Sequence, residues 1–285
     1  MNKELPQFIN HIVSSLRSIE GITAIALGGS RARGKHTHTS DVDLGIYYNR
    51  ENPPDLIALN RLACEFDDNH RVNLITAIGE WGKWINGGGW LKVEGVGVDF
   101  LYRDLATVNR VIDDCYQGRI TIDYQPGHPH GFVSSIYMGE IAMCQVLYDP
   151  DGVLEALKVK TKPYPVGLKQ ATIDTFAWEI SFSLLVAKKA IARNDIVYAA
   201  GCCFRSVACM NQVLFALNED YLLNEKGATA VAGTFAISPS DYQQRVERAF
   251  TLLAVDTKSI TEAIVILEAI EDDLSQWYGN RRIAM

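Results

Sequence analysis

The chain has 285 residues, of which 48% are hydrophobic and 21% are charged, a composition typical of a globular protein with room for two domains. Its formal net charge of −7 at pH 7 gives no basic footprint of the kind that general nucleic-acid binders carry. The N-terminus shows no apolar signal-peptide core, and no run approaches the ~18–20 apolar residues of a membrane span. The sequence therefore predicts a cytoplasmic protein without membrane contacts, and it disfavours a nucleic-acid partner while leaving a local basic groove open.

The first part of the chain alternates between helical and strand patterns. Apolar residues at helical spacing predict a first helix over residues 5–20, and a second is predicted over 56–66. Short apolar runs predict strands at 21–29, 41–48, 71–78 and 96–103. The Gly- and Trp-rich segment 79–93 is either a hairpin or a loop that borders a functional site.

The second part is mainly helical. Helices are predicted over 104–118 and 133–147, and the segment TKPYPVG marks a boundary between domains at residues 1–160 and 161–285. An up-and-down helical bundle is predicted from long periodic stretches at 168–193, 196–218, 239–253 and 256–278. The fold class is therefore α/β (α+β), with a mixed sheet and flanking helices followed by a C-terminal helical bundle.

Three carboxylates stand out among the predicted strands. Asp41 and Asp43 are one residue apart in DVDLGIYY, so both point to one strand face while Val42 and Leu44 point into the core. Taken alone, the pair also fits a solvated edge strand or an Asx-type turn. Asp99 repeats the pattern in VGVDFLYR and would join the pair if the two strands are neighbours. Three close carboxylates need cations between them, and hard oxygen ligands select Mg²⁺.

The segment before this pair is suited to binding phosphates. Gly28 and Gly29 allow a tight backbone turn, and Ser30 is predicted as a helix N-cap that helps to hold an anion. Either Arg31 or Arg33 could clamp a triphosphate, and Arg31 is favoured. A phosphate cradle beside a cluster of metal-binding carboxylates indicates phosphoryl or nucleotidyl transfer.

The order GGS (28–30), ten intervening residues, DVD (41–43) and a later Asp99 resembles the nucleotidyltransferase superfamily. That superfamily includes DNA polymerase beta, poly(A) polymerases, and the aminoglycoside and lincosamide nucleotidyltransferases. The resemblance covers about residues 20–105. It implies that Gly29 and Ser30 bind nucleotide phosphates, that the three aspartates hold Mg²⁺, and that an acceptor hydroxyl attacks the α-phosphorus and releases pyrophosphate.

The chain length and helical second half are similar to the antibiotic-modifying branch and its bacterial relatives. This resemblance implies ATP, or another nucleoside triphosphate, as donor and a small molecule, such as an antibiotic, as acceptor. It also makes a homodimer an expectation, because the acceptor cleft of such relatives can form between subunits. Some of these enzymes use a glutamate as general base, so the resemblance implies that role for Glu140 or for Asp99.

Several of these residues have plainer interpretations. Glu140 lies in the apolar stretch SSIYMGEIAMCQVL, and it could instead be the structural partner of an arginine or a backbone amide. Trp81, Trp84 and Trp90 either stack on a substrate or pack in the core. The histidines of GHPHG fit an ordinary loop better than a binding loop.

Two alternative functions remain open at this point. The acceptor could be an RNA end or a protein side chain, although the sequence has no clustered Lys/Arg stretch with which to build an RNA groove. The protein could also be a non-catalytic nucleotide sensor. Such a sensor is expected to have lost a metal-binding carboxylate, and all three are present here.

Overall fold

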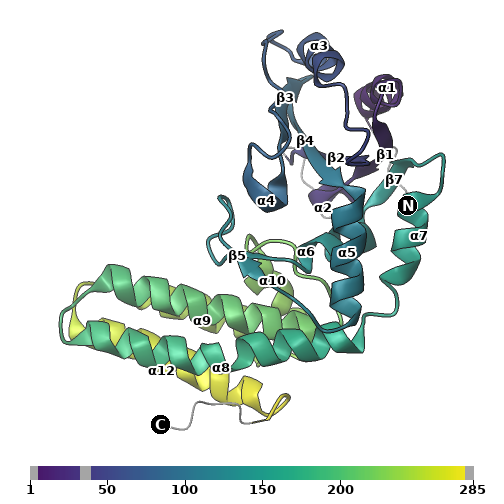
Figure 1. Cartoon of the computed structure of the whole chain (residues 1–285). Helices are drawn as coiled ribbons and strands as arrows, with labels where there is room; N and C mark the ends of the chain where they lie inside the picture. The colour runs from purple at the N-terminus through teal and green to yellow at the C-terminus, as the bar shows by residue number, and fades with distance from the viewer. Residues whose placement is uncertain (1–5, 33–39, 280–285) are drawn as a thin grey trace. The chain divides into compact units, whose positions relative to one another are not determined.

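A computed structural model describes residues 6–32 and 40–279 of the chain (Figure 1). It contains a mixed five-stranded sheet with flanking helices and a set of C-terminal helices, which confirms the predicted fold class. The chain forms two compact units, one from Met1–Asp113 with Tyr137–Pro163 and the other from Asp114–Ile136 with Tyr164–Met285. The division at residues 160 and 161 stays a prediction; the units change near that point, but residues 114–136 belong with the helical unit.

The sheet of the first unit has the strand order β3-β4-β2-β1-β7. Its strands are β1 (Ile22–Leu27), β2 (Val42–Tyr48), β3 (Gly88–Val93), β4 (Val96–Asp104) and β7 (Gln145–Tyr148). Strands β2 and β4 pair in parallel, whereas the other neighbours pair antiparallel. The predicted neighbourhood of the two aspartate-bearing strands is therefore confirmed.

One face of this sheet is the core of the unit. Val42, Leu44, Val98 and Phe100 each have 0% exposure and belong to a cluster shared with the helices α1 (Gln7–Leu16) and α3 (Leu56–Phe66). Both helices lie on this face of the sheet in Figure 1. Because side chains alternate along a strand, the residues between these apolar ones point to the opposite face, which carries Asp43 and Asp99.

Two predicted elements of the first unit were wrong. Residues 71–78 do not form a strand; only Ile75 makes an isolated bridge, and its N–H donates to the side chain of Asn60. The helix predicted over 133–147 ends as α6 (Ile136–Met143) and is followed by β7. In both places the apolar residues show no clear periodicity that separates helix, strand and irregular chain. The remaining helices of the unit are α2 (Gly29–Ala32), α4 (Gly82–Ile85), α5 (Leu105–Tyr116) and α7 (Val153–Lys160).

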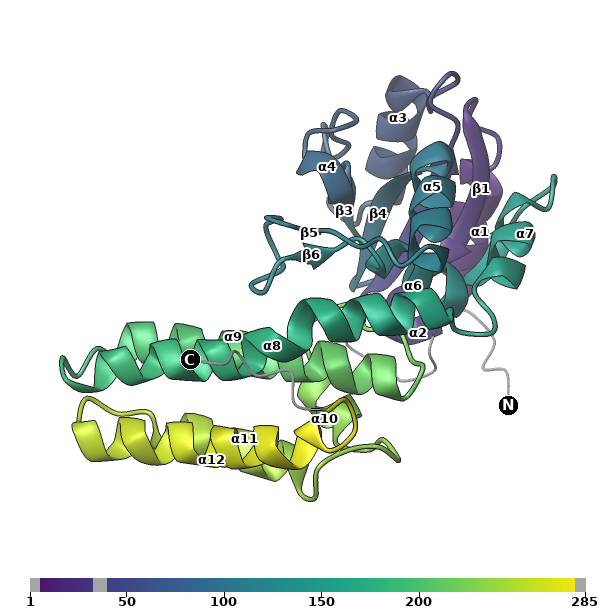
Figure 2. The same cartoon turned by 60° about the horizontal axis from the view of Figure 1, so that its bottom comes forward.

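The second unit is built mainly of helices. Its elements are β5 (Ile122–Asp123), β6 (Phe132–Val133), α8 (Val166–Ile191), α9 (Ile196–Leu217), α10 (Ala228–Ala232), α11 (Tyr242–Leu252) and α12 (Thr257–Ser275). Figure 2 shows α8 beside α9 and α11 beside α12, so the four long predicted helices are confirmed. Helix α9 is long and apolar enough to cross a membrane by length and composition alone, but 72% of its apolar window is buried inside the unit. It is the central helix of an apolar core.

Candidate active site

A polar row crosses three neighbouring strands of the sheet. Asp43 on β2 is the direct partner of Asp99 on β4, and Asp99 is the direct partner of Trp90 on β3. Paired residues of neighbouring strands project from the same face, and neighbouring strands lie about 4.8 Å apart. The three side chains therefore form one row on the face opposite the apolar core, as predicted for Asp43 and Asp99.

The turn after β1 brings backbone against Asp43. The Gly28 N–H donates to the Asp43 carbonyl at 2.8 Å, which continues the β1–β2 pairing into the turn. Gly29 has a φ of +61°, and a Cβ placed on it would overlap Oδ2 of Asp43. Only glycine fits there without strain, because its φ is left-handed and the carboxylate occupies the space of a side chain.

The helix after this turn begins two residues earlier than predicted. It runs from Gly29 to Ala32, and the Gly28 carbonyl accepts from the Ala32 N–H at 3.2 Å. Ser30 is therefore inside the helix and is not its N-cap, which corrects the predicted capping position. Gly28 is thus the residue in the capping position, and it has no side chain with which to accept from the first N–H groups of the helix.

Arg31 holds the start of β2. Its Nη2 donates to the Ser40 carbonyl at 2.6 Å, and its Nε donates to the carbonyls of Ser40 and Asp41 at 3.2 and 3.1 Å. This guanidinium therefore orients the backbone that carries Asp41 and leads to Asp43. Its predicted contact with a triphosphate stays a prediction, and the alternative, Arg33, lies outside the described residues.

Asp41 lies just before β2 and is exposed, at the mouth of an open pocket of about 470 Å³. The lining of this pocket includes Asp41, Arg71, Trp90, Lys92, Gly97 and Asp99. A Cβ on Gly97 would overlap Oδ1 of Asp41, so the missing side chain leaves room for that carboxylate. The pocket therefore extends from the predicted metal-binding residues along the β4–β3 side of the sheet.

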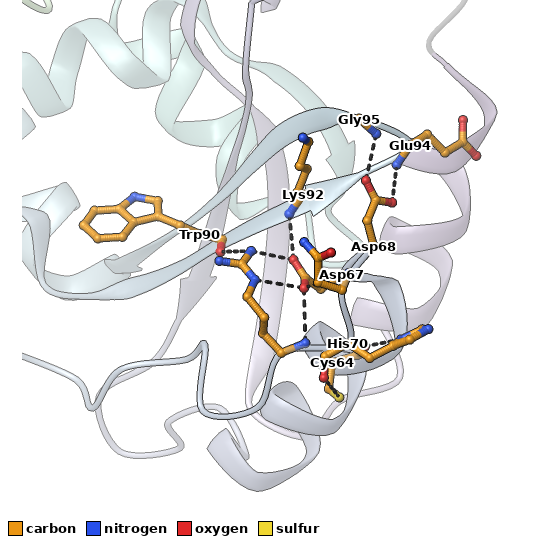
Figure 3. Close-up of polar contacts among 10 residues, drawn as sticks. Cys64, Asp67, Asp68, His70, Trp90, Lys92, Glu94 and Gly95 are labelled. Carbon is orange, nitrogen blue, oxygen red and sulfur yellow. Dashed lines mark hydrogen bonds and ion pairs between the residues drawn. The ribbon is translucent and has the colours of Figure 1, made fainter.

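An ion pair between buried Asp67 and exposed Arg71, which lines this pocket, was not found from the sequence (Figure 3). Asp67 has 0% exposure, and its carboxylate accepts from Arg71 Nε at 2.9 Å and Nη2 at 2.5 Å. It also accepts from the Lys92 N–H at 2.9 Å, and Arg71 donates to the Trp90 carbonyl at 3.3 Å. The Arg71 hydrogen bonds hold the pKa of Asp67 well below its usual range. Residues 67–71 form a bend and a turn after α3, so the i, i+4 rule for helices gave no signal for this pair.

The neighbouring Asp68 fixes the turn between β3 and β4. Its two carboxylate oxygens accept from the N–H groups of Glu94 at 2.8 Å and Gly95 at 2.9 Å (Figure 3). Glu94 and Gly95 have φ values of +51° and +79°, as a two-residue hairpin turn of type I′ requires. A fixed turn fixes the register of the hairpin, and that register places Trp90 opposite Asp99.

The three tryptophans have different roles. The ring of Trp90, 61% exposed, stacks on Trp81 with centroids 4.5 Å apart and an interplanar angle of 20°. Figure 3 shows this indole pointing away from the Asp67 cluster. Trp84 has 2% exposure and packs edge-to-face on Tyr137 at 5.5 Å. Trp84 is thus a core residue, whereas Trp81 and Trp90 form an aromatic wall beside the pocket.

Glu140 is bound by an arginine. Its two oxygens accept from Nε and Nη2 of Arg103, each at 2.7 Å. Burial works to lower the pKa of Arg103, but Glu140 outweighs it and raises that pKa above its usual value. Arg103 lies four residues beyond Asp99 on β4, about 13 Å at the usual rise of a strand. The geometry favours the structural interpretation of Glu140 over its role as general base.

The donor set suits Mg²⁺, which prefers oxygen ligands. Asp43 and Asp99 face each other, and Gly29 and Gly97 leave space beside Asp43 and Asp41. Within residues 6–32 and 40–279, no three or more His, Cys, Asp or Glu side chains are already grouped as a metal site. Carboxylates that repel one another gather closely only around a cation. The metal role of Asp41, Asp43 and Asp99 accordingly stays a prediction.

The helical unit contains a second polar cluster, on the GHPHG loop. Glu179 pairs with Arg205 through two hydrogen bonds of 2.5 and 2.8 Å, and Arg205 donates to the carbonyl of His130 at 2.7 Å. Glu225 accepts from the His130 N–H at 2.8 Å. Burial, followed by the charge of Arg205, lowers the pKa of His130 to about 4. These contacts hold the loop to α8 and α9.

Comparisons with known proteins give two domain matches. The sequence profile of the nucleotidyltransferase domain matches residues 9–103, and that of a domain of unknown function (DUF4037) matches residues 134–226. Among solved structures, the chain is similar to a nucleotidyltransferase-like protein from Exiguobacterium sibiricum, with 9% sequence identity and a TM-score of 0.43, over 95% of this chain and 76% of that one. No curated protein matches the chain.

The first match spans the whole candidate site. It begins in α1, ends in β4, and includes the glycine turn and the three aspartates. The polar row of the sheet thus lies in the part of the chain where this domain is recognised. Residues 9–103 are therefore recognised as a nucleotidyltransferase domain, the domain of the polymerase-beta-like superfamily.

Proposed function

We propose that the enzyme transfers a nucleoside monophosphate, with ATP as the favoured donor, to a hydroxyl of a small molecule in a Mg²⁺-dependent reaction. The observation that carries this proposal is the direct pairing of Asp43 with Asp99 beside a turn in which Gly29 lies against the Asp43 carboxylate. Two facing carboxylates next to exposed backbone suit a metal-bound triphosphate better than any other ligand class.

Each residue has a distinct part in this proposal. Asp43, Asp99 and Asp41 would hold Mg²⁺, which stabilises the charge that develops on the phosphoryl oxygens when it is bound. The backbone turn at Gly28 and Gly29 would bind the triphosphate, with Ser30 directly after it in sequence. Arg31 fixes the chain at Asp41 through its bonds to backbone carbonyls.

The chemical step is a displacement at the α-phosphorus. The acceptor oxygen forms a bond to this phosphorus, and the bond to the β-phosphate bridging oxygen breaks, so that pyrophosphate leaves. The acceptor proton goes to Asp99, one of the carboxylates that line the pocket, or to solvent. Asp99 is favoured over Glu140 as general base, because Glu140 is bound by Arg103.

Other parts of the proposal rest on sequence alone. An antibiotic is one member of the proposed acceptor class, and a nucleic-acid acceptor is disfavoured by the acidic charge of the chain. The proposal also includes a cytoplasmic location, no membrane association and a homodimer. These parts, too, are supported by the sequence alone.

The test is a transfer assay with α-labelled ATP, GTP, CTP and UTP in the presence of Mg²⁺. Pooled aminoglycosides, pooled lincosamides, bulk RNA and extract protein serve as acceptors, with Asp43→Asn as the inactive variant and Glu51→Gln, on an exposed residue, as the matched control. Label from ATP on a small-molecule pool, absent with Asp43→Asn, supports the proposal. Label only on RNA or protein contradicts the acceptor class, and failure of ATP to bind contradicts the proposed donor.

A further inference from the structure

We propose that the pocket between Asp99 and Trp90 is the acceptor subsite, and that it takes a hydroxylated ring without net positive charge, stacked on Trp90. This inference rests on the proposed function, because it places the second substrate relative to the triphosphate. It adds a substrate class that the nucleotidyltransferase domain does not specify.

The order of groups across the sheet gives the direction of attack. Gly29 follows β1, Asp43 lies on β2, Asp99 on β4 and Trp90 on β3, and these strands are neighbours in that order. In-line displacement requires the attacking and leaving oxygens on opposite sides of the phosphorus. With pyrophosphate at the glycine turn, the attacking hydroxyl comes from the β3 side, where the pocket of about 470 Å³ lies.

The aromatic wall indicates a flat-faced acceptor. Trp90 is 61% exposed, and Trp81 stacks on it at 4.5 Å, so its ring orientation is set before a ligand arrives. The Trp90 backbone is held as well, through its carbonyl and Arg71. Because the Trp90 indole is already held in one orientation, a planar or cyclic ligand can stack on it at low entropic cost. A sugar or nucleoside ring can stack on this aromatic surface, whereas a flexible protein side chain as acceptor would gain little from it.

The local charges disfavour a polycation. The guanidinium of Arg71 is matched by Asp67, while the exposed Lys92 adds a further positive charge to the pocket lining. Once Mg²⁺ has neutralised Asp41 and Asp99, the pocket has no surplus of negative charge. An acceptor with several ammonium groups would then be repelled by Lys92, and a neutral ring would not.

The test uses the enzyme loaded with Mg²⁺ and AMPCPP, an ATP analogue that cannot be cleaved between the α- and β-phosphates. Saturation-transfer NMR measures binding of a panel of neutral glycosides and nucleosides and of the polycation kanamycin. We expect a neutral ring to bind, with an affinity about tenfold lower in Trp90→Ala and restored in Trp90→Phe. Trp178→Ala removes an exposed tryptophan from the helical unit and is the matched control, with unchanged binding expected.

Calorimetry of AMPCPP binding distinguishes a failure of the proposed function from a failure of the acceptor-subsite inference. If AMPCPP and Mg²⁺ do not bind the wild type, the proposed function itself fails. If AMPCPP binds but Trp90→Ala weakens it as much as it weakens the ring, Trp90 holds the donor base and the inference is overturned. Binding of kanamycin in preference to every neutral ring, or of no ring at all, also overturns it. Lys92→Glu is expected to admit kanamycin.

Discussion

Asp43 and Asp99 stand directly opposite each other in the parallel pairing of β2 and β4. Parallel neighbours are joined by a long crossover, so the two carboxylates come from segments 56 residues apart and still share one face of the sheet. The pairing makes both residues part of one site, and each should be needed for the reaction.

Replacing Asp43 or Asp99 with asparagine should lower the rate of nucleotidyl transfer by about 10²–10³-fold or more, because one charge that stabilises the transition state is lost. The fold should survive, since neither side chain belongs to the apolar core. Single-turnover transfer and thermal unfolding measure the two quantities separately. If a variant keeps full activity, the aspartate that it replaces is not part of the proposed site.

The Gly29→Ala substitution should destabilise the protein by about 1–3 kcal/mol, the cost of holding a residue with a side chain in a left-handed conformation. It should also abolish transfer, because the new Cβ displaces the Asp43 carboxylate. Gly28→Ala is the matched control. A Cβ on Gly28 meets Asp43 at 3.7 Å, an ordinary contact, so stability should change little. Equal effects of the two substitutions would contradict the role of the turn.

The Glu140→Gln substitution should cost about 3 kcal/mol of unfolding free energy, because it leaves the buried guanidinium of Arg103 without a charged partner. Urea unfolding measures this loss. Replacing both residues together, as in Arg103→Met with Glu140→Leu, should restore much of it. If Glu140→Gln instead kept its stability and lost transfer activity, Glu140 would be a catalytic base after all.

The Asp67–Arg71 pair should make stability sensitive to acid. The pKa of Asp67 is lower in the folded state than in the unfolded chain, where it is about 3.9. The stabilisation is therefore complete above about pH 4 and declines as the pH falls toward the folded-state pKa. Thermal unfolding of the wild type and Asp67→Asn should differ most near neutral pH and converge in acid. A constant difference at every pH would contradict this linkage.

His130 should produce a second pH dependence in a different range. Its folded-state pKa of about 4 lies below the unfolded value of about 6.5. The unfolded chain therefore binds the proton first, and stability declines as the pH falls from about 6.5 to about 4. Arg205 opposes that proton, while Glu225 and Glu179 favour it. His130→Gln should flatten the profile in this range, whereas His11→Gln, on an exposed face of α1, should not.

The sequence was sufficient for the features that follow local rules. Alternation along DVDLGIYY and VGVDFLYR separates core residues from Asp43 and Asp99, and it needs no knowledge of distant contacts. The long helices of the second unit were equally visible, because their mainly apolar stretches of 26 and 22 residues are far longer than a strand.

The remaining features depend on tertiary contacts. The partner of Glu140 could not be chosen from the sequence, because Arg103 meets it only through the packing of α6 on β4. The alignment of Trp90 with Asp99 follows from the two-residue turn at Glu94 and Gly95. That dipeptide was a usable hairpin signal, but the binding of its N–H groups by Asp68 was not visible in the sequence.

The hydrogen bonds from Arg31 to the carbonyls of Ser40 and Asp41 hold the start of β2 in place, whatever the length of the connection before it. Arg31 is tied to the backbone at Ser40 and Asp41 by side-chain hydrogen bonds, and lengthening the chain between two points that are tied in this way costs little free energy. Residues can therefore be inserted between Ala32 and Ser40, by evolution or by design, without changing the positions of Asp41 and Asp43. The same fold can in this way acquire new specificities without rebuilding its chemistry.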